Sequence, residues 1–240
     1  MVNHDSPTAA GVLAIIPAFT AAPLAAIGAG LHPARDRLDG VPLLAWPIAT
    51  AMAAPSVISS IVVTDDDATA DLAENLGCPA ALIDPAVFSD RPSATDAEDA
   101  GLALGYAAWL ERGHRPPAAV AVLSVTTPLR PRWLIHDALD ALLKDPRAQR
   151  VVSVQGQHAD APRTDHTDLR RPGLLDAHGA SAAPATTITI PAPDTGPNPI
   201  RNLDDLDSAA SIATFHAHRL GITHPRQIVG LAGGESWEAA

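Results

Sequence analysis

Cysteine, aromatic residues and charged residues are all scarce in this chain of 240 residues. Cys78 is the only cysteine, so the chain forms neither an internal disulfide nor a thiolate metal cluster. This fits a reducing compartment, and we expect an inert, partly buried thiol, with a reactive thiol as the alternative. Aromatic residues make up 3% and charged residues 18% of the sequence. Alanine and branched aliphatic residues must therefore fill the core.

Positive charge is scarce as well, and the formal net charge at pH 7 is -11. A surface this acidic repels nucleic-acid phosphates and anionic lipids. We therefore expect neither nucleic acid nor a membrane as a partner. A small anionic substrate remains compatible with this charge where a local basic pocket overrides the overall field.

The stretch from Thr8 to Leu31 carries no charge, but it lacks the features of a targeting or spanning segment. Prolines and glycines interrupt it, and the residues before it offer only His4 and Asp5 in place of a basic segment. We interpret it as a buried strand followed by a loop of small residues, and we expect a cytoplasmic protein. The alternative is a targeting segment on a small-molecule binding protein outside the cytosol.

Short apolar runs alternate with helical patterns along the chain. The runs are rich in valine and isoleucine and are bounded by turn residues, which is typical of strands buried on both faces. They occupy Val12 to Ala18, Ser60 to Thr64, Ala80 to Ile83, Ala119 to Ser124, Val151 to Val154 and Thr186 to Ile190. Helical patterns cover Leu43 to Ala53, Asp67 to Leu76, Asp96 to Arg112, Pro131 to Lys144 and Asp204 to Leu220. This alternation predicts an α/β fold with a mostly parallel sheet and helices on both faces.

The same alternation indicates one domain over residues 11–229. We expect a flexible N-terminus at residues 1–10 and a tail at residues 230–240. Residues 155–199 interrupt the pattern, because they are polar up to Pro184 and rich in proline afterwards. We predict an irregular excursion there, either a functional lid or a mobile loop.

Four segments occur in an order and spacing that resemble the acylneuraminate and KDO cytidylyltransferases, the CMP–sugar-acid synthetases. They are Ile15 to Ala18 with Leu38 to Trp46, Ile61 to Asp66, Thr126 to Arg130 with Val151 to Val154, and Ile200 to Ala209. The resemblance spans most of the chain and implies a single GT-A-like, Rossmann-like nucleotidyltransferase domain. It implies the reaction in which CTP and an acidic sugar give a CMP-sugar and pyrophosphate. Mg²⁺ is the expected cofactor, and CTP or another nucleotide the expected partner.

The resemblance also implies a nucleotide site, whose residues here are Ala18, Gly28, Gly30, Ser124, Thr126, Thr127 and Arg130. The family carries a basic, glycine-containing loop after its first strand, but residues 18–34 contain no arginine or lysine. Gly28 and Gly30 could shape an anion nest and Arg35 could reach inward; alternatively, the loop serves packing. Thr126 and Thr127 offer hydroxyls to a substrate, or form an ordinary turn before the next helix.

The metal site that the resemblance implies is altered here. In a family motif of the form D-I-D-T-x-x-D, the two leading aspartates bind the metal, and their positions are Pro199 and Arg201. We therefore expect no metal site, with Asp205, the trailing aspartate, as the remaining candidate. Arg201 could replace the cation and bind phosphate, or it could pair with an aspartate near the helix start.

Further acidic and hydroxyl residues need an interpretation. The family contacts its sugar in the region that holds Ser93, Thr95 and Asp99 here, although these residues could equally open a helix. Residues 65–67 are three adjacent aspartates, which we expect to cap a helix rather than to bind metal. The family's Tyr-x-x-Asn-Gly-Ala pattern, near its dimer contact, is missing from the sequence, so we do not expect a homodimer by that route.

The basic loop after the first strand and the two metal-binding aspartates are thus both absent. Electrostatic stabilisation, which such groups provide, usually dominates reactions of this kind. We expect a cytidylyltransferase-like protein that is catalytically degenerate. One alternative is a non-catalytic binding or regulatory protein. Another is an enzyme with metal-independent phosphate handling on an unusual acid, in which Arg35, Arg130 and Arg201 converge at the carboxyl edge of the sheet, with Arg35 and Arg201 as the catalytic candidates.

Overall fold

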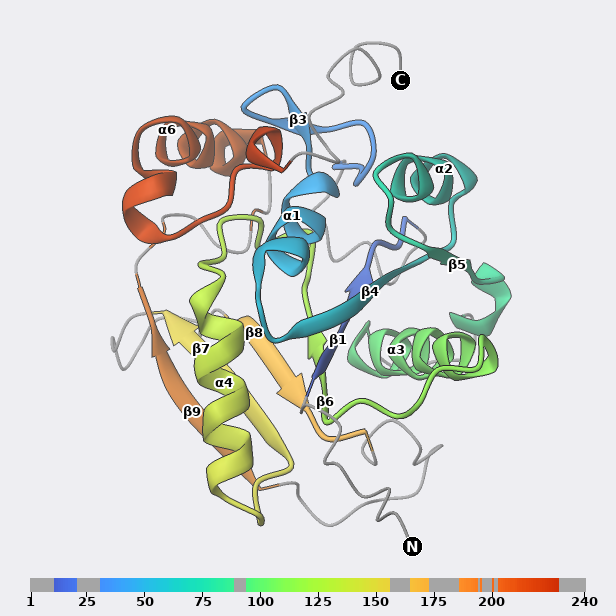
Figure 1. Cartoon of the computed structure of the whole chain (residues 1–240). Coiled ribbons are helices and arrows are strands. Elements are labelled where there is room, and N and C mark those ends of the chain that lie inside the picture. Colours follow the sequence, from blue (N-terminus) through green and yellow to red (C-terminus); the bar gives the residue numbers. More distant parts are fainter. Residues whose placement is uncertain are drawn as a thin grey trace, which may run out of the picture.

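A seven-stranded sheet organises the computed structural model, which describes residues 11–20, 31–88, 94–155, 165–172, 186–193, 195, 200 and 203–228. The strand order is β5-β4-β1-β6-β8-β7-β9 (Figure 1). The strands are β1 (Val12–Pro17), β4 (Val57–Thr64), β5 (Ala80–Leu82), β6 (Ala119–Val122), β7 (Arg150–Gln155), β8 (Asp165–Arg170) and β9 (Thr187–Ala192). Neighbours pair in parallel except at β8, which is antiparallel to β6 and β7.

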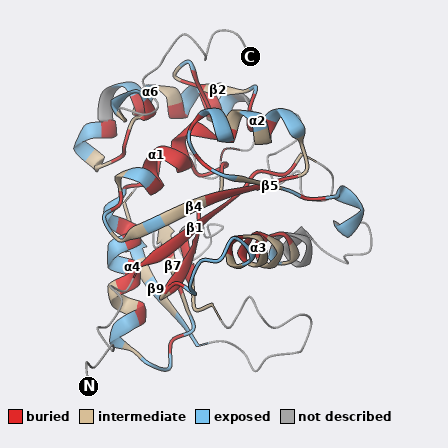
Figure 2. Cartoon of the chain, turned by 45° about the vertical axis from the view of Figure 1, so that its right-hand side comes forward, coloured by how far each residue is buried: buried red, intermediate tan, exposed pale blue. Residues whose placement is uncertain are grey.

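Helices pack on both faces of this sheet (Figure 2). Four of them contribute to the apolar core on one side: α1 (Ala45–Ala53), α2 (Asp67–Asn75), α4 (Trp133–Lys144) and α6 (Leu203–Leu220). The core on the other side contains residues of α3 (Ala94–Glu111). The predicted α/β class, with a mostly parallel sheet between helices, is confirmed.

Strand β1 lies inside the sheet between β4 and β6, and its side chains contribute to both apolar cores. All six of its residues are buried, and its side chains alternate between the faces. Ala14 and Ile16 join the core beneath α1 and α4, whereas Leu13 and Ile15 join the core beneath α3. A continuous apolar run is what a strand covered on both faces requires.

Two glycines let α3 approach the sheet closely. A Cβ on Gly105 would lie 2.3 Å from the side chain of Val63, and a Cβ on Gly101 would lie 2.4 Å from the ring of Phe19. Both distances are far shorter than real carbon–carbon contacts. Gly101 thereby lets α3 pack against Phe19, just after β1, and Gly105 lets it pack against Val63 of β4.

A small hairpin lies beside the sheet, formed by β2 (Arg37–Leu38) and β3 (Val41–Pro42). Asp39 and Gly40 both have positive φ, as a tight two-residue hairpin turn demands. The chain after α6 fastens this hairpin, because His224 Nε2 lies 3.1 Å from Asp39 Oδ2 and its ring packs edge-on against Trp46. The sequence analysis does not predict this hairpin.

Each predicted strand and helix is present, with ends that differ by a few residues. The prediction of an irregular excursion at residues 155–199 is wrong in part. This range contains β8, which was not predicted, as well as the predicted strand at β9. Strand β8 reads Asp-His-Thr-Asp-Leu-Arg, so its polar side chains conceal the strand pattern. The expected flexible terminus and tail lie outside the described residues. No described helix has the length and apolarity to cross a membrane.

Candidate functional site

The carboxyl ends of β1, β4 and β6 meet at one edge of the sheet, which lies uppermost in Figure 1. In open α/β sheets, ligands bind at this edge. Ala18 follows β1 and is held to β4 here, because its N–H donates to Val63 O at 2.9 Å and its carbonyl accepts from Thr64 Oγ1 at 2.7 Å. The predicted site residue Ala18 is therefore at the edge, with its backbone engaged.

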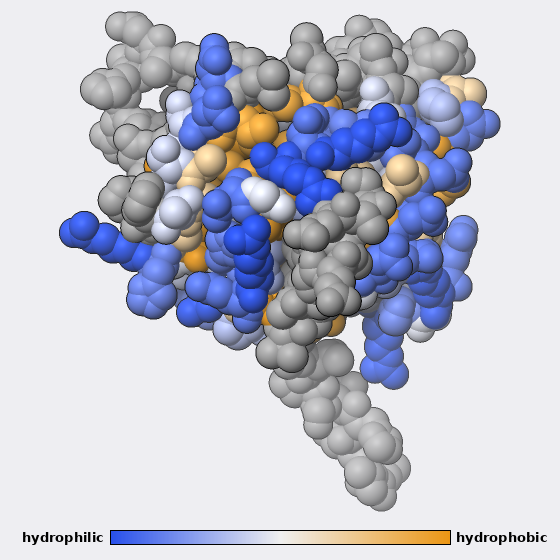
Figure 3. Space-filling view, turned by 90° about the horizontal axis from the view of Figure 1, so that it is seen from above, coloured by the Kyte–Doolittle hydropathy of each residue, from blue (hydrophilic) through white to orange (hydrophobic). Residues whose placement is uncertain are grey.

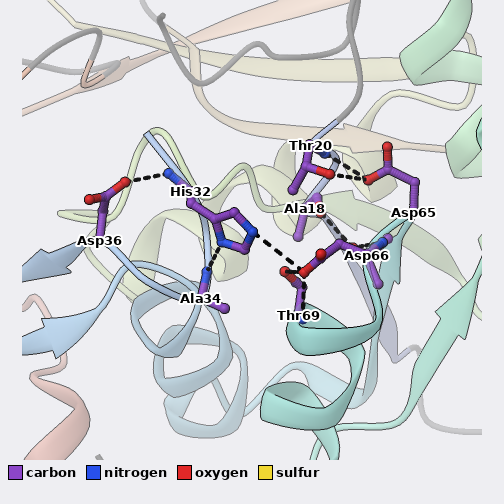
Figure 4. A network of polar contacts seen from close by, with 9 residues as sticks. Ala18, Thr20, His32, Ala34, Asp36, Asp65, Asp66 and Thr69 are labelled. Atoms are coloured by element: carbon purple, nitrogen blue, oxygen red, sulfur yellow. Dashed lines mark hydrogen bonds and ion pairs between the residues drawn. The ribbon is translucent and has the colours of Figure 1, made fainter. Parts of the chain in front are cut away.

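Two aspartates follow β4 and are held by threonines (Figure 4). Asp65 Oδ1 accepts from the N–H and the hydroxyl of Thr20, at 2.7 and 3.2 Å. Asp66 Oδ2 accepts from the N–H and the hydroxyl of Thr69, at 2.8 and 2.6 Å, which caps α2. The predicted capping role is thus confirmed for Asp66, while Asp65 ties the loop after β1 to the loop after β4.

His32 adds a further contact to Asp66, and sequence reasoning missed it. Its Nε2 lies 3.5 Å from Asp66 Oδ2, its Nδ1 accepts from Ala34 N at 3.2 Å, and its own N–H donates to Asp36 (Figure 4). The contact between His32 and Asp66 joins segments far apart in the chain, so no local pattern marks it.

The environment of Asp66 holds it in the charged form. Burial by itself raises the pKa of this carboxyl, but the hydrogen bonds from Thr69 and the charges of His32 and Arg35 outweigh burial. The net result is a pKa below the usual 3.8. The exposed Arg35 is therefore close enough to the end of β4 to act on Asp66 electrostatically.

The loop after β6 forms a compact group of hydroxyls. Ser124 Oγ and Thr126 Oγ1 are 2.8 Å apart, and Thr127 Oγ1 donates to Ser124 O at 3.2 Å. Thr126 O accepts from the N–H of Ile200 at 2.7 Å, which brings the segment before α6 to the same edge. Three predicted site residues are therefore together, although their hydroxyls already contact one another or the backbone.

A buried guanidinium lies under this loop. Arg130 is 1% exposed, and its Nη2 donates to Thr127 Oγ1. Burial lowers the pKa of Arg130 to about 9, so the side chain still carries its charge at neutral pH. Burying a cation is costly unless it meets an anion or several acceptors. Arg130 thus places a positive charge directly beneath the predicted nucleotide site.

The other predicted site residues are distributed differently. Asp99 pairs with Arg170, with 2.6 Å between Asp99 Oδ1 and Arg170 Nη1, and Asp205 is in the first turn of α6. Thr95 lies in the first turn of α3. Gly28, Gly30, Ser93, Pro199 and Arg201 lie outside the described residues. The expected convergence of Arg35, Arg130 and Arg201 therefore remains a prediction.

The carboxylates at this edge do not fit the Mg²⁺ that the resemblance implies. Asp65 and Asp66 both lie after β4, but a threonine hydroxyl and N–H group engage one oxygen of each carboxylate. Across the described part of the chain, no group of three or more His, Cys, Asp and Glu residues could hold a metal ion. We therefore assign no chemical step to a metal here.

Seen from above in Figure 3, the surface carries an apolar patch beside strongly hydrophilic side chains.

Neither a family of known sequences nor an individually curated protein matches the chain. Solved structures do match. A CMP:2-keto-3-deoxy-manno-octonic acid synthetase, solved in complex with CTP, is 13% identical, with a TM-score of 0.65 over 85% of this chain and 98% of that one. The 4-diphosphocytidyl-2C-methyl-D-erythritol synthase of Anaerococcus prevotii is 13% identical, with a TM-score of 0.56 over 85% and 99%.

A third match is Rv0371c of Mycobacterium tuberculosis, which is 12% identical, with a TM-score of 0.59 over 85% of this chain and 99% of that one. Identities this low establish the fold alone. The chain therefore has the Rossmann-like nucleotidyltransferase fold of cytidylyltransferases, as the sequence resemblance implies. It is a divergent example of this fold, and its length corresponds to nearly the whole of each matched structure.

Proposed function

We propose that this chain is a cytidylyltransferase-like protein of the acylneuraminate/KDO type that binds a cytidine nucleotide but transfers it weakly or not at all. The observation that carries the proposal is the buried Arg130 beneath Thr126 and Thr127, at the carboxyl end of β6. In a nucleotidyltransferase fold, this position suits a phosphate or base oxygen. Its hydroxyls can donate to an anion, and the buried charge of Arg130 behind Thr127 attracts an anion electrostatically.

The scarcity of positive charge near the proposed nucleotide site supports nucleotide binding without efficient nucleotidyl transfer. Transfer to an acid would need positive charge on the triphosphate and on the departing pyrophosphate. The loop at residues 18–34 has no lysine or arginine, and the aspartates after β4 are engaged by threonines. Arg130 can favour binding, but a single fixed cation stabilises ground state and transition state to similar degrees.

The proposed partners are therefore CTP and an acidic sugar, and the proposed compartment is the cytoplasm, which agrees with the single cysteine. A regulatory or binding role would use the nucleotide as a signal or as a structural ligand. Pyrophosphate release that persists without Mg²⁺ would instead support an enzyme that handles phosphate with arginine alone.

The test combines binding and turnover on the same preparation. Calorimetric titration with CTP, with and without Mg²⁺, should show binding that depends little on the metal. Pyrophosphate release across a panel of acidic sugars should stay near the background rate. Brisk, magnesium-dependent release would contradict the proposed degeneracy, and absence of CTP binding would contradict the proposed nucleotide site.

Arg130→Lys gives the matched test of the site itself. Lysine keeps the charge but loses the planar set of donors. Arg130 holds Thr127 in place through its Nη2, and a displaced Thr127 hydroxyl would lose a hydrogen bond to the charged ligand, which contributes about 1.5–3 kcal/mol, so CTP affinity should fall about tenfold or more. The exposed Arg132 is the control, since Arg132→Lys lies on the same loop and should leave affinity unchanged. Equal affinities in the two variants would remove Arg130 from the site.

A further inference from the structure

The segment that follows α6 runs beside the loop that follows β6. Ile222 forms an antiparallel bridge with Pro131, and the N–H of Arg132 donates to the carbonyl of Gly221 at 3.2 Å. Helix α6 itself lies above the carboxyl edge of the sheet in Figure 1. Residues far along the chain are thereby held against the loop of the proposed nucleotide site.

This pairing places Thr223 next to Arg130. In an antiparallel pair, the residues that flank a bridge stand opposite each other, so the register that joins Ile222 to Pro131 sets Thr223 opposite Arg130. Side chains of opposed residues project to the same side, with Cβ atoms about 4.5–5.5 Å apart. Both residues are buried, with 4% of Thr223 and 1% of Arg130 exposed. Thr223 therefore lies beside the charge that the proposed nucleotide site uses.

The hydroxyl of Thr223 is buried without a hydrogen bond. Among the described residues, Thr223 Oγ1 has no hydrogen-bond partner. Other buried threonines differ, since Thr50 donates to Trp46 O at 3.0 Å and Thr64 donates to Ala18 O at 2.7 Å. An unpaired buried hydroxyl destabilises the folded state, and such groups are rare in native proteins. Valine would fill the same space without this cost, so the hydroxyl does not serve the stability of the chain by itself.

The surroundings of Thr223 favour a negatively charged oxygen as its partner. The buried guanidinium of Arg130 is positively charged, and its field at the opposed Thr223 attracts an anion and repels a cation. Thr127 accepts from the same guanidinium, at Nη2. The Thr223 hydroxyl can rotate to donate a hydrogen bond to such an oxygen. Because the position is buried, a single oxygen of a phosphate fits it better than a base or a sugar ring.

We propose that Thr223 is a further ligand-binding residue of the nucleotide site, and that its hydroxyl donates to a phosphate oxygen. The inference rests on the proposed function and adds to it a contact from the segment after α6. A nucleotide phosphate and free pyrophosphate present the same kind of oxygen, so both should bind here. The hydroxyl of Thr223 thus lowers the stability of the chain by itself and contributes affinity in the complex.

Thr223→Val tests this contact, since valine has the shape of threonine without its hydroxyl. CTP, pyrophosphate and cytidine are titrated calorimetrically, and thermal unfolding is followed without them. The affinities for CTP and pyrophosphate should fall about tenfold, whereas the affinity for cytidine should not change. The melting temperature should rise by about 2–4 °C, because an unpaired buried hydroxyl is removed. A role in packing alone would not move affinity and stability in opposite directions.

Thr50→Val is the matched control, because Thr50 is equally buried but its hydroxyl has a partner. This variant should melt at a lower temperature and should bind CTP and pyrophosphate as the unaltered chain does. Thr223→Ser keeps the hydroxyl and should also bind both as the unaltered chain does. Weak binding by Thr223→Ser would contradict a role of the hydroxyl itself.

The pyrophosphate titrations decide the inference. It is overturned if Thr223→Val binds pyrophosphate as tightly as the unaltered chain, or if the unaltered chain does not bind pyrophosphate. It is also overturned if Thr223→Val melts lower or fails to fold, because the hydroxyl would then have a structural role. Binding of pyrophosphate but not of CTP by the unaltered chain would count against the proposed function instead.

Discussion

Asp65 and Asp66 follow the same strand, and each is held by a threonine from a different part of the chain. Asp65 accepts from Thr20, after β1, and Asp66 accepts from Thr69, inside α2. A carboxylate with two such donors is stabilised where it stands and has fewer lone pairs left for a metal. At this scale, partners decide what an aspartate does.

Asp66→Ala is expected to lower the free energy of unfolding by about 1 kcal/mol, the usual effect of losing an N-cap. The cap accepts two bonds from Thr69, and the substitution also removes the contact with His32. Urea unfolding at pH 7, followed by circular dichroism, measures the loss. Asp67→Ala is the control, because Asp67 is exposed at the first position of α2. Equal losses in the two variants would refute the capping role.

The stability lost in Asp66→Ala should depend on pH, and the pKa of Asp66 fixes the direction. The pKa of Asp66 lies below 3.8 in the folded protein, so the charged form contributes stability at pH values above 3.8. This contribution is lost as the pH falls through the lower, folded value. The difference in stability between the unaltered chain and Asp66→Ala should therefore be constant near neutrality and narrow below pH 4. A difference that widens in acid would contradict the assignment.

Strand β8 shows how an element can depend on contacts that its own sequence does not reveal. It has one fully buried apolar residue, Leu169, between two charged ones. Its antiparallel pairing with β7 brings Arg150 to Asp168, and Arg170, two residues further along β8, contacts Asp168 on the same face. Without these ion pairs, burial of the charged side chains of β8 would cost free energy that no contact offsets.

Asp168→Ala is expected to destabilise the protein by about 3 kcal/mol, because it leaves the largely buried Arg170 and the partly exposed Arg150 without their shared carboxylate. Thermal and urea unfolding measure the effect. Asp140→Ala on α4 is the matched control, whose exposed pair with Lys144 is worth about 0.3–0.5 kcal/mol. A loss for Asp168→Ala no larger than for Asp140→Ala would show that the network contributes nothing to β8.

The whole molecule excludes water from its one thiol. Cys78 is 2% exposed in the core beneath α1, and its Sγ lies 3.3 Å from Ser60 Oγ. Burial raises the pKa of this thiol, so little reactive thiolate forms near neutral pH. The expectation of an inert cysteine rests on packing over the whole fold rather than on neighbours in sequence.

Cys78 should therefore report on global unfolding. We expect it to react with a disulfide reagent roughly a thousandfold or more slowly than N-acetylcysteine in native buffer, because a stable domain exposes its core only rarely. The rate should rise with urea in parallel with the loss of circular dichroism. Rapid labelling of the native chain would mean that the core beneath α1 opens locally, and that the thiol is reactive after all.

The alternation of strands and helices could be predicted because it depends on local patterns. Apolar runs such as β1 must be covered on both faces, and helices end at glycines such as Gly77, Gly113 and Gly221, all with positive φ. Strand β8 and the β2–β3 hairpin could not, because their residues are polar or few and their partners are distant in sequence.

The candidate site could be predicted in its composition but not in its contacts. Ser124, Thr126 and Thr127 were expected near one edge because they follow a buried strand, and they are close together. That Thr20 would bind Asp65, or that Asp99 would bind Arg170, depends on segments 45 and 71 residues apart. Such pairs leave no periodic signal in the sequence.

The α/β class, the order of most elements and the lack of arginine and lysine in the loop after β1 can be derived from the amino-acid sequence. These follow from side-chain period, turn residues and charge, which are properties of short segments. The burial of Arg130 beside the hydroxyls and the contacts of Asp168 with two arginines depend instead on tertiary packing. Those arrangements arise where strands meet, and the free energy of a charge depends on what surrounds it.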